Sequence, residues 1–406
     1  MTTGVVVTGL GLVTAAGVGT EATWRAVCAG TSTAATDPAL AGLPVDFSCR
    51  VPDFDARALL GRRTTMQYDR FVQLGLIAAQ EAVADAGLDP ATWDGTRVGV
   101  VVGCSVGGAG TWETQHRKFR DDGPETVSSL LMPMLIPNMV AGHLGIRFRA
   151  TGPNLVTATA CASGATAIGV ARDMLRQGAC DIVLAGGTDA AVVPLIVTGF
   201  SQMRALSTRT EDPTTASRPF DADRDGFVIG EGSGILVLER ADHAKARGAR
   251  VRARLVGYGA SADAYHATAP DPTGSSVERA IRTALADAGA SPSDVDHVNA
   301  HGTSTPLNDL AEARVLARCL GPGPAVTSAK GVLGHTLGAA GAIEAALTVL
   351  TLENGLIPPT ANLESQDPEI EIDIVTKEAR HRRVDLALTN SFGFSGQNAV
   401  LAFAAG

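Results

Sequence analysis

The sequence predicts an α/β protein, because short apolar runs rich in β-branched residues alternate with longer stretches whose apolar residues recur at helical spacing. The runs at 4–10 (GVVVTGL), 97–103 (RVGVVVG) and 181–187 (DIVLAGG) each end at or near a glycine and predict buried strands. Residues 71–86 and 275–289 predict helices. Strands that alternate with helices are typical of buried sheets covered by helices.

The rest of the chain continues this alternation. Residues 154–160 (NLVTATA) predict a strand that runs directly into an Ala-rich helix, CASGATAIGVARDML, which begins at Cys161. The region 207–232 is polar and contains Pro213 and Pro219, so we expect a long loop over the molecule. Further strands are predicted at 234–240, 252–258, 296–300, 385–390 and 397–403, and further helices at 308–319 and 338–353.

Two segments of similar design indicate two related halves. TATACASGATAIG and KGVLGHTLGAAGAIEA are both turns that open an Ala/Gly-rich helix. Each has a reactive side chain, Cys161 or His335, at or near the helix start. We expect an N-terminal half at 1–250 and a C-terminal half at 251–406.

Composition narrows the class of protein. The 406 residues are 45% hydrophobic but only 4% aromatic and include 46 glycines, which predicts a large core of aliphatic and small side chains. A net charge of −9 argues against nucleic acid as a partner. No apolar run reaches the roughly 20 residues that span a bilayer. The start MTTGVVVTGLG does not resemble a signal peptide, so we expect a cytoplasmic protein with no membrane partner.

The six cysteines predict neither a disulfide framework nor a zinc site, because none forms a CxxC pair and none lies within three residues of a histidine. Cys161 differs from the others in its place at a strand-to-helix junction. The free N–H groups and partial positive charge of a helix start would stabilise a thiolate and lower the thiol pKa. A nucleophile is one interpretation of Cys161, and a buried structural cysteine is the other.

Two histidines follow turns of a similar kind. His301 ends a predicted strand and precedes a glycine and a Thr/Ser-rich turn, AHGTST, where it could equally cap the loop. His335 follows Lys330 by five residues in a stretch whose glycines let the backbone approach a ligand closely. Glu344 comes nine residues later. Lone Lys and Glu residues are usually surface charges, and a buried pair with Lys330 is the other interpretation, because the surrounding residues are small or apolar.

The last glycine turn, NSFGFSGQN at 390–398, lies between two predicted strands. Its backbone N–H groups could stabilise an oxyanion. A tight turn with no further role is the alternative.

Together these segments resemble the β-ketoacyl synthase family. TACASG, AHGTST, SAKGVLGHTLGAAG and NSFGFSG occur in that family's order and with its spacing, and so does the loop SRPFDADRDGFVIGEG. The resemblance runs from VVVTGLGLVT at residue 5 to the C-terminus. The family's elongating branch pairs one cysteine with two histidines, as this chain does, whereas the starter-condensing branch uses Cys, His and Asn.

The resemblance implies the thiolase fold, in which two similar halves pack as five layers, α-β-α-β-α. It also implies a decarboxylative Claisen condensation, in which malonyl on acyl carrier protein extends a cysteine-bound acyl chain by two carbons. No metal and no organic cofactor is implied. The implied partners are acyl carrier protein and a second subunit.

Roles for single residues follow from the same resemblance. Cys161 would be the nucleophile that accepts the acyl chain. His301 and His335 would assist decarboxylation and stabilise the enolate oxygen. Lys330 would orient the histidines, with Glu344 behind it.

The glycine turn and the substrate pocket also have counterparts in the family. The N–H groups of Cys161 and Phe394 would form the oxyanion hole, and Phe394, between Gly393 and Ser395, would be the gate that turns aside for an acyl chain. For Met132, Met134 and Leu135, near the expected dimer interface, ordinary core is the alternative. The pocket residues implied are Val106, Met132, Met134, Phe200, Thr303 and Thr305.

Two departures separate this chain from fatty-acid enzymes. Their gating turn commonly reads GFGGTN, where this chain has Ser395 and Gln397, so the loop has less freedom to open. An Arg-Lys pair that docks carrier protein is replaced by Glu125 and Thr126. A basic docking patch, or else a solvated surface, is expected at the remaining cations: Arg62, Arg63, Arg117, Lys118, Arg120 and Arg204.

These departures favour a specialised synthase, the catalytic subunit of a type II polyketide system that pairs with a chain-length factor. The second interpretation is a fatty-acid enzyme that forms a homodimer. A non-catalytic scaffold subunit of the same fold is a third possibility, and the joint presence of Cys161, His301, Lys330 and His335 argues against it.

Overall fold

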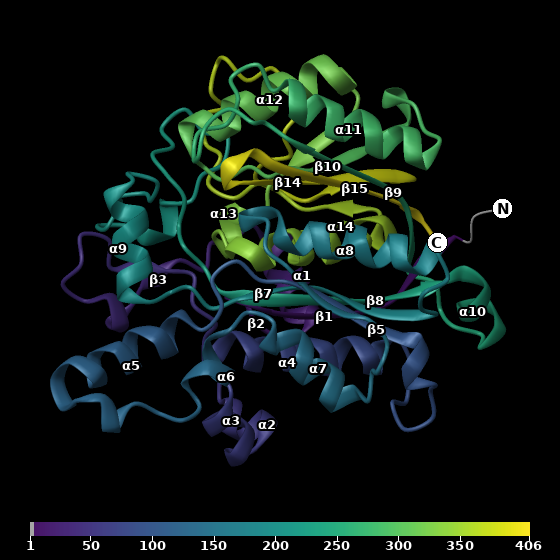
Figure 1. Ribbon diagram of the computed structural model, residues 1–406. Helices are drawn as coiled ribbons and strands as arrows, with labels where there is room; N and C mark the ends of the chain where they lie inside the picture. Colours follow the sequence, from purple (N-terminus) through teal and green to yellow (C-terminus); the bar gives the residue numbers. More distant parts are fainter. Residues whose placement is uncertain (1–3) are drawn as a thin grey trace.

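Two halves of a β-sheet are stacked with helices between them and on both outer sides, in the order α-β-α-β-α (Figure 1). This confirms the architecture that the resemblance implies. The computed structural model describes residues 4–406. The middle layer contains α8 (Ser163–Arg176) and α14 (Ala340–Asn354). The outer layers contain α4 (Arg70–Asp85), α7 (Met139–Phe148), α11 (Ser275–Ala288) and α12 (Pro306–Leu320).

The two halves of the sheet have the same strand order. The first half runs β1 (Val5–Thr14), β8 (Gly232–Arg240), β7 (Ile182–Asp189), β5 (Val98–Gly103), β6 (Asn154–Thr157). The second half runs β9 (Ala253–Ala262), β15 (Gln397–Ala405), β14 (Leu386–Gly393), β10 (His297–Asn299), β11 (Ala325–Thr327). In both halves the three strands farthest from the junction are parallel and the remaining pairs are antiparallel.

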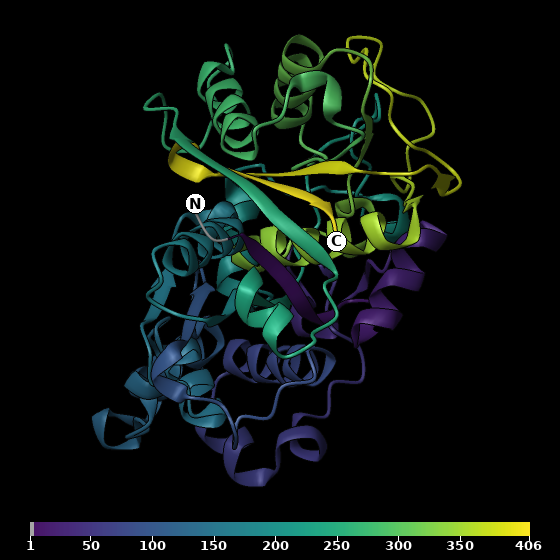
Figure 2. The ribbon, with the colours of Figure 1, turned by 90° about the vertical axis from the view of Figure 1, so that its right-hand side faces the viewer.

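Strands β1 and β9 join the halves and run side by side (Figure 2). Val6 pairs with Arg254 and Val7 with Ala253, antiparallel. The division of the chain at residue 250 stays a prediction of domain limits.

Helix α14 is buried on every side, from Ala340 to Leu352. It packs on α8 and on strands of both halves. Such contact needs small side chains: a Cβ on Gly164 would lie 2.8 Å from the Ala342 nitrogen, and one on Gly341 would lie 2.6 Å from the Ser391 hydroxyl oxygen. This central layer accounts for the many small and few aromatic residues of the sequence.

Turns at one edge of the sheet carry the candidate site residues. Cys161 follows β6, His301 follows β10, and Phe394 follows β14. Because β5, β6, β7, β10, β11 and β14 run parallel within their halves, the turns after their carboxyl ends gather where ligands bind in α/β sheets.

The remaining helices and strands lie around these layers. The helices are α1 (Thr20–Ala29), α2 (Ala56–Leu60), α3 (Arg62–Gln67), α5 (Ala109–Asp122), α6 (Leu131–Leu135), α9 (Pro194–Gln202), α10 (Ala241–Ala246) and α13 (Lys330–Leu333). The strands are β2 (Gly17–Val18), β3 (Ala35–Thr36), β4 (Phe47–Ser48), β12 (Leu356–Ile357) and β13 (Arg380–His381). Within residues 4–406, no helix has the length and apolar character required to cross a membrane.

The predicted strand at 154–160 is too long. Strand β6 ends at Thr157, and α8 begins at Ser163 after a 3-10 turn at Ala160–Ala162. Ala160 has φ +48°, a left-handed conformation that interrupts both strand and helix. The long loop predicted at 207–232 is confirmed up to β8, with a single 3-10 turn at Pro213–Thr215.

We predict that Gly11→Ala destabilises the fold by about 1–3 kcal/mol or more, because it overpacks β1 against α4. A Cβ on Gly11 would lie 1.8 Å from the Ala78 carbonyl oxygen. Gly323→Ala is the matched control, since its Cβ would meet nothing within 4 Å. Thermal unfolding of both variants checks this, and equal melting temperatures would contradict the packing argument.

Candidate active site

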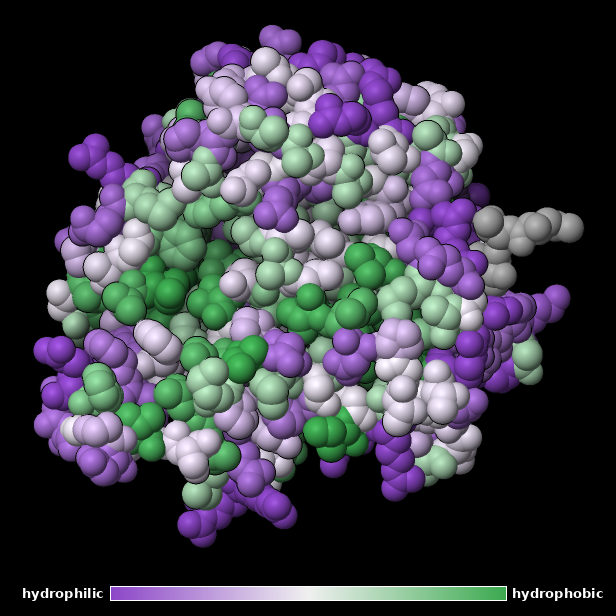
Figure 3. Space-filling model, viewed as in Figure 1, coloured by the Kyte–Doolittle hydropathy of each residue, from purple (hydrophilic) through white to green (hydrophobic). Residues whose placement is uncertain are grey.

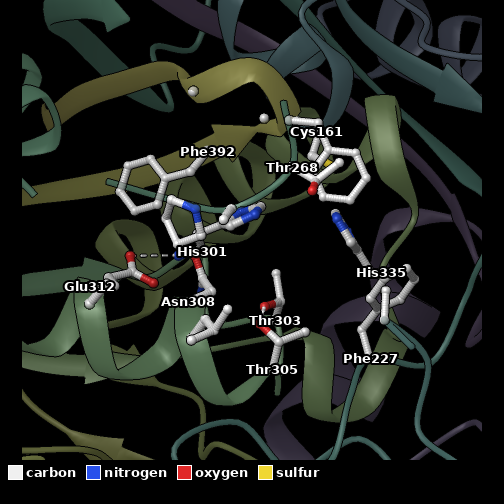
Figure 4. Close-up of a pocket in the computed structure, with 18 of the residues that line it drawn as sticks. Cys161, Phe227, Thr268, His301, Thr303, Thr305, Asn308, Glu312, His335 and Phe392 are labelled. Atoms are coloured by element: carbon white, nitrogen blue, oxygen red, sulfur yellow. Dashed lines mark hydrogen bonds between the residues drawn. The ribbon is translucent and has the colours of Figure 1, made fainter. Parts of the chain in front are cut away.

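A cavity of about 410 Å³ brings the candidate side chains together. Cys161, His301 and His335 line it from three different turns (Figure 4). Phe394, Phe200, Thr303 and Thr305 line it as well. Apolar residues gather on the surface around α9, beside this cavity (Figure 3), and Met203 at its rim is 46% exposed.

The turn that presents Cys161 is fixed by its neighbours. The Ser163 hydroxyl donates to the Ala160 carbonyl at 2.6 Å and accepts from the Thr159 N–H at 2.9 Å. Gly393 lies so close that a Cβ there would be 2.3 Å from the Thr159 carbonyl oxygen. The positive φ of Ala160 is thus supported from two sides, as strained turns at functional sites are.

Burial raises the pKa of the Cys161 thiol to about 12, which corrects the prediction that the helix start would lower it. The positive charge of Lys330 and the backbone N–H groups of Phe394 and Cys161 favour the thiolate, but burial outweighs them. Cys161 also precedes the first residue of α8 by two positions. The thiol is therefore protonated at neutral pH.

His301 and His335 form an adjacent pair of neutral rings. Their ring centroids lie 5.4 Å apart with the ring planes at 84°. Burial, with a further contribution from the charge of Lys330, holds the pKa of each histidine well below its usual range. The backbone N–H of His335 donates to the Val228 carbonyl at 2.7 Å, and the Phe227 ring packs edge-on against the His335 imidazole.

Lys330 and Glu344 form a buried ion pair behind His301. The Lys330 ammonium donates to a Glu344 carboxylate oxygen and, at 2.6 Å, to the His301 carbonyl oxygen. Both side chains are almost fully buried. Burial raises the pKa of Glu344 to about 7, while the charge of Lys330 opposes that rise. The structure thus brings together the two charges that the sequence suggested as a pair.

Glu312 belongs to this site although sequence reasoning did not single it out. Its buried carboxylate on α12 accepts the backbone N–H groups of His301 and Gly302, each at 2.8 Å, and the Asn390 side-chain amide at 3.1 Å. It fixes the turn that carries His301 (Figure 4). The available signal was a glutamate on the predicted helix at 308–319, which follows the His-Gly pair in the chain.

The glycine turn between β14 and β15 faces the Cys161 sulfur with the Phe394 N–H. Ser395 has φ +64°, a conformation that favours glycine, and its N–H donates to the Ala267 carbonyl at 2.8 Å. The Phe394 ring packs against Phe200, with centroids 6.2 Å apart.

The remaining sequence-predicted pocket residues lie outside the cavity of the single chain. Val106 packs against the apolar cluster that contains Cys161 but does not line the cavity. Met132 is 54% exposed and Met134 is half-buried on α6, and neither lines the cavity. Their assignment to an acyl pocket stays a prediction.

The predicted docking cations lie on α3, on α5 and after α9 of the single chain. Arg204 is exposed at the rim of the cavity, directly after α9. Arg62 and Arg63 are exposed on α3, away from α9 (Figure 1). Lys118 is exposed on α5, and Arg117 and Arg120 of the same helix line a shallow pocket together with Pro194 and Leu195 of α9.

Comparison with known proteins places this site in a family. The family model described as Beta-ketoacyl synthase, N-terminal domain matches residues 2–244, and the corresponding C-terminal domain matches residues 252–364. The 3-oxoacyl-(acyl-carrier-protein) synthase 2 of Synechocystis sp. is 45% identical over 406 residues, which cover 98% of this chain and 97% of that protein.

Two solved structures of similar fold also cover the whole chain. The ishigamide ketosynthase/chain length factor structure has a TM-score of 0.94 at 34% identity, with 100% of both chains covered. A type II polyketide synthase ketosynthase in complex with its acyl-carrier protein, bound to the hexaketide, has a TM-score of 0.92 at 33% identity, again with 100% of both chains covered.

These matches define an enzyme of the acyltransferase class. The chain belongs to the β-ketoacyl synthase family.

Buried neutral histidines predict that the protein loses stability in acid. An unfolded histidine takes up a proton near pH 6.5, whereas burial lowers the pKa of His297 to about 4. The unfolded chain therefore binds more protons between these values, and the free energy of unfolding falls as the pH falls from 6.5 toward 4. For His297 alone the loss is on the order of 3 kcal/mol.

Denaturant unfolding at pH 7 and at about pH 4.5 measures this loss. His297→Asn keeps a donor for the Ala325 carbonyl, which the ring nitrogen Nδ1 contacts at 2.9 Å, but does not titrate. It should lose less stability over this interval than the wild type, and an equal loss in both proteins would rule out this role of His297.

Proposed function

We propose that the protein is an elongating β-ketoacyl-acyl-carrier-protein synthase, in which Cys161 accepts an acyl chain and His301 and His335 act on malonyl carrier protein. The observation that supports this most directly is one cavity lined by a buried thiol and two neutral histidines. A scaffold subunit that catalyses no reaction would not need a buried thiol beside two neutral histidines.

In the first half-reaction the Cys161 sulfur attacks the carbonyl carbon of an acyl thioester, and the carrier thiol leaves with a proton. The N–H groups of Cys161 and Phe394 face the sulfur and would receive the negative charge that develops on the carbonyl oxygen. The raised thiol pKa means that the cysteine proton must pass on as the carbon–sulfur bond forms.

In the second half-reaction malonyl thioester loses CO2, and the electron pair of the broken carbon–carbon bond becomes an enolate. Neutral imidazole N–H groups of His301 and His335 would donate to the enolate oxygen, where charge appears only as the bond breaks. The enolate carbon then attacks the Cys161 thioester and releases the sulfur as leaving group. Lys330 and Glu344 keep His301 in place through the His301 carbonyl.

Acyl carrier protein is the proposed donor of both acyl groups. The cavity opens at Arg204 and Met203, and Thr303 and Thr305 line the path to Cys161. Carrier proteins are acidic, so the exposed Arg204 at the entrance favours docking. A related ketosynthase has been solved with its acyl-carrier protein, which supports the same partner here.

A second subunit is proposed at the β6 edge of the sheet. β6 pairs with β5 on one side only, and its Leu155 is 46% exposed. An exposed apolar edge strand invites pairing with another chain. The Synechocystis relative favours a fatty-acid enzyme, while the ketosynthase/chain length factor neighbour favours a heterodimer in polyketide synthesis.

We also propose a cytoplasmic location. All six cysteines are free thiols, and five of them are buried. Free thiols without disulfides fit a reducing compartment.

Replacing the nucleophile separates the two half-reactions. We predict that Cys161→Ala abolishes acyl transfer and condensation, because no sulfur remains to form the thioester. Cys161→Gln should likewise block acylation but leave malonyl decarboxylation, because the histidines are untouched. Intact-mass analysis of acylation and release of CO2 from malonyl carrier protein measure these outcomes. Acylation in either variant would refute the mechanism.

The choice between homodimer and heterodimer is tested with the chain expressed alone. A fatty-acid enzyme should be dimeric and should condense acyl and malonyl carrier protein without another subunit. A polyketide subunit should be inactive alone and gain activity with a chain-length factor. Size-exclusion chromatography with light scattering and a condensation assay distinguish the two, and activity of the chain alone would exclude an obligate heterodimer.

A further inference from the structure

Asp189, the last residue of β7, has a carboxylate with no exposed surface and an unusual number of donors. It accepts the N–H groups of Ser105 at 3.0 Å, Val106 at 3.1 Å and Gly338 at 2.7 Å, as well as the Ser105 hydroxyl. Because every partner donates, only a group that accepts at both oxygens satisfies them.

These donors come from two segments that are far apart in the sequence and that both contribute to the apolar cluster of Cys161. Ser105 and Val106 follow β5 in the N-terminal half, and Val106 packs against the apolar cluster that contains Cys161 and Leu337. Gly338 lies 149 residues from Asp189, at the start of the turn into α14. The carboxylate therefore connects β7 and the turn after β5 to the turn that precedes α14, beside the cluster that contains Cys161.

The Gly338 turn needs such support. Leu337, which lines the cavity, has φ +50°, and a leucine in this conformation persists only where its surroundings enforce it. His335 lies two residues earlier, in the same turn. A Cβ on Gly338 would lie 2.5 Å from a carboxylate oxygen of Asp189, so the turn is pressed directly against that side chain.

Asp189 does not line the cavity and has no direct part in the chemistry. Its negative charge nevertheless reaches the site, because it raises the pKa of the Cys161 thiol.

We propose that Asp189 is a positioning residue that holds Val106 and Leu337 beside Cys161 and thereby sets how well an acyl chain binds next to the sulfur. The inference rests on the proposed function, since it assumes that Cys161 is acylated.

The test compares Asp189→Asn with Asp69→Asn. Asp69 is a matched control: a buried aspartate that accepts the N–H groups of Phe71 at 3.3 Å and Thr111 at 3.1 Å and the Thr111 hydroxyl, but does not line the cavity. The asparagine at 189 turns an amide NH2 toward at least one donor. We expect the KM for acyl transfer from acyl carrier protein to rise about tenfold or more, with a smaller change in kcat. Asp69→Asn should keep both constants.

Alkylation of Cys161 by iodoacetamide, followed by intact mass at pH 8, provides a readout that does not depend on activity. Loss of the negative charge should speed alkylation of Asp189→Asn by about threefold, because Asp189 raises the pKa of the Cys161 thiol and the thiolate is the reactive form. Asp189→Glu keeps the charge while displacing the hydrogen bonds, so it should raise KM without faster alkylation. Equal acceleration in the Asn and Glu variants would show that access to the thiol changed, not its charge environment.

The proposal fails if Asp189→Asn has wild-type KM, or if Asp69→Asn raises KM equally. If Asp189→Asn does not fold, Ser105→Ala replaces it as the test variant. This substitution removes one hydroxyl donor to Asp189 and should raise KM about threefold. An unchanged KM overturns the proposal. If wild-type Cys161 accepts no acyl chain from any carrier, the proposed function fails, and the alkylation rates still report whether Asp189 acts on Cys161.

Discussion

The ion pair between Lys330 and Glu344 is the interaction on which the rest of the site depends. Taking two charges out of water is costly, and a single unpaired charge at this depth would destabilise the fold by about 3–5 kcal/mol. Pairing makes burial of the ammonium tolerable, and the ammonium in turn holds the His301 carbonyl. Its charge also helps to keep both imidazoles neutral. One buried pair thus positions His301 and adds to the burial that keeps both histidines neutral.

The fold builds this site at a junction between two similar halves. The same strand order occurs twice, and each half contributes turns from the carboxyl ends of its parallel strands. Cys161 comes from the first half, and His301 and His335 from the second. The close fit of α8 and α14 between the sheets depends on glycine and alanine at Gly164, Gly341 and Ala342. Small residues in the middle layer are therefore a requirement of the site geometry as much as of the core.

Much of this arrangement could be predicted from the sequence. Periodicity was sufficient for the alternating strands and helices, and the order of the motifs was sufficient for Cys161, His301, Lys330 and His335. The small neighbours of Glu344 correctly suggested a buried pair as one interpretation. Strand β6 was predicted too long, because the left-handed turn at Ala160 depends on contacts from Gly393, far along the chain.

Neither the role of the buried carboxylates nor the direction of the Cys161 pKa could be predicted from the sequence, because both depend on tertiary contacts. Glu312 and Asp189 accept backbone N–H groups, which any residue can supply, so no pattern of side chains marks them. The direction of the Cys161 pKa depends on how completely the tertiary structure excludes water, and a local argument from the helix start gave the opposite sign.

The protonated state of Cys161 has a consequence for the chemistry of the cell around it. Oxidants such as peroxides attack thiolates far faster than thiols, and the products beyond the sulfenic acid are difficult to reverse. A sulfur that burial keeps protonated is a poor target for them. The burial that makes the nucleophile hard to ionise thereby protects it between turnovers, and its reactivity is confined to the moments when an acyl thioester lies beside it.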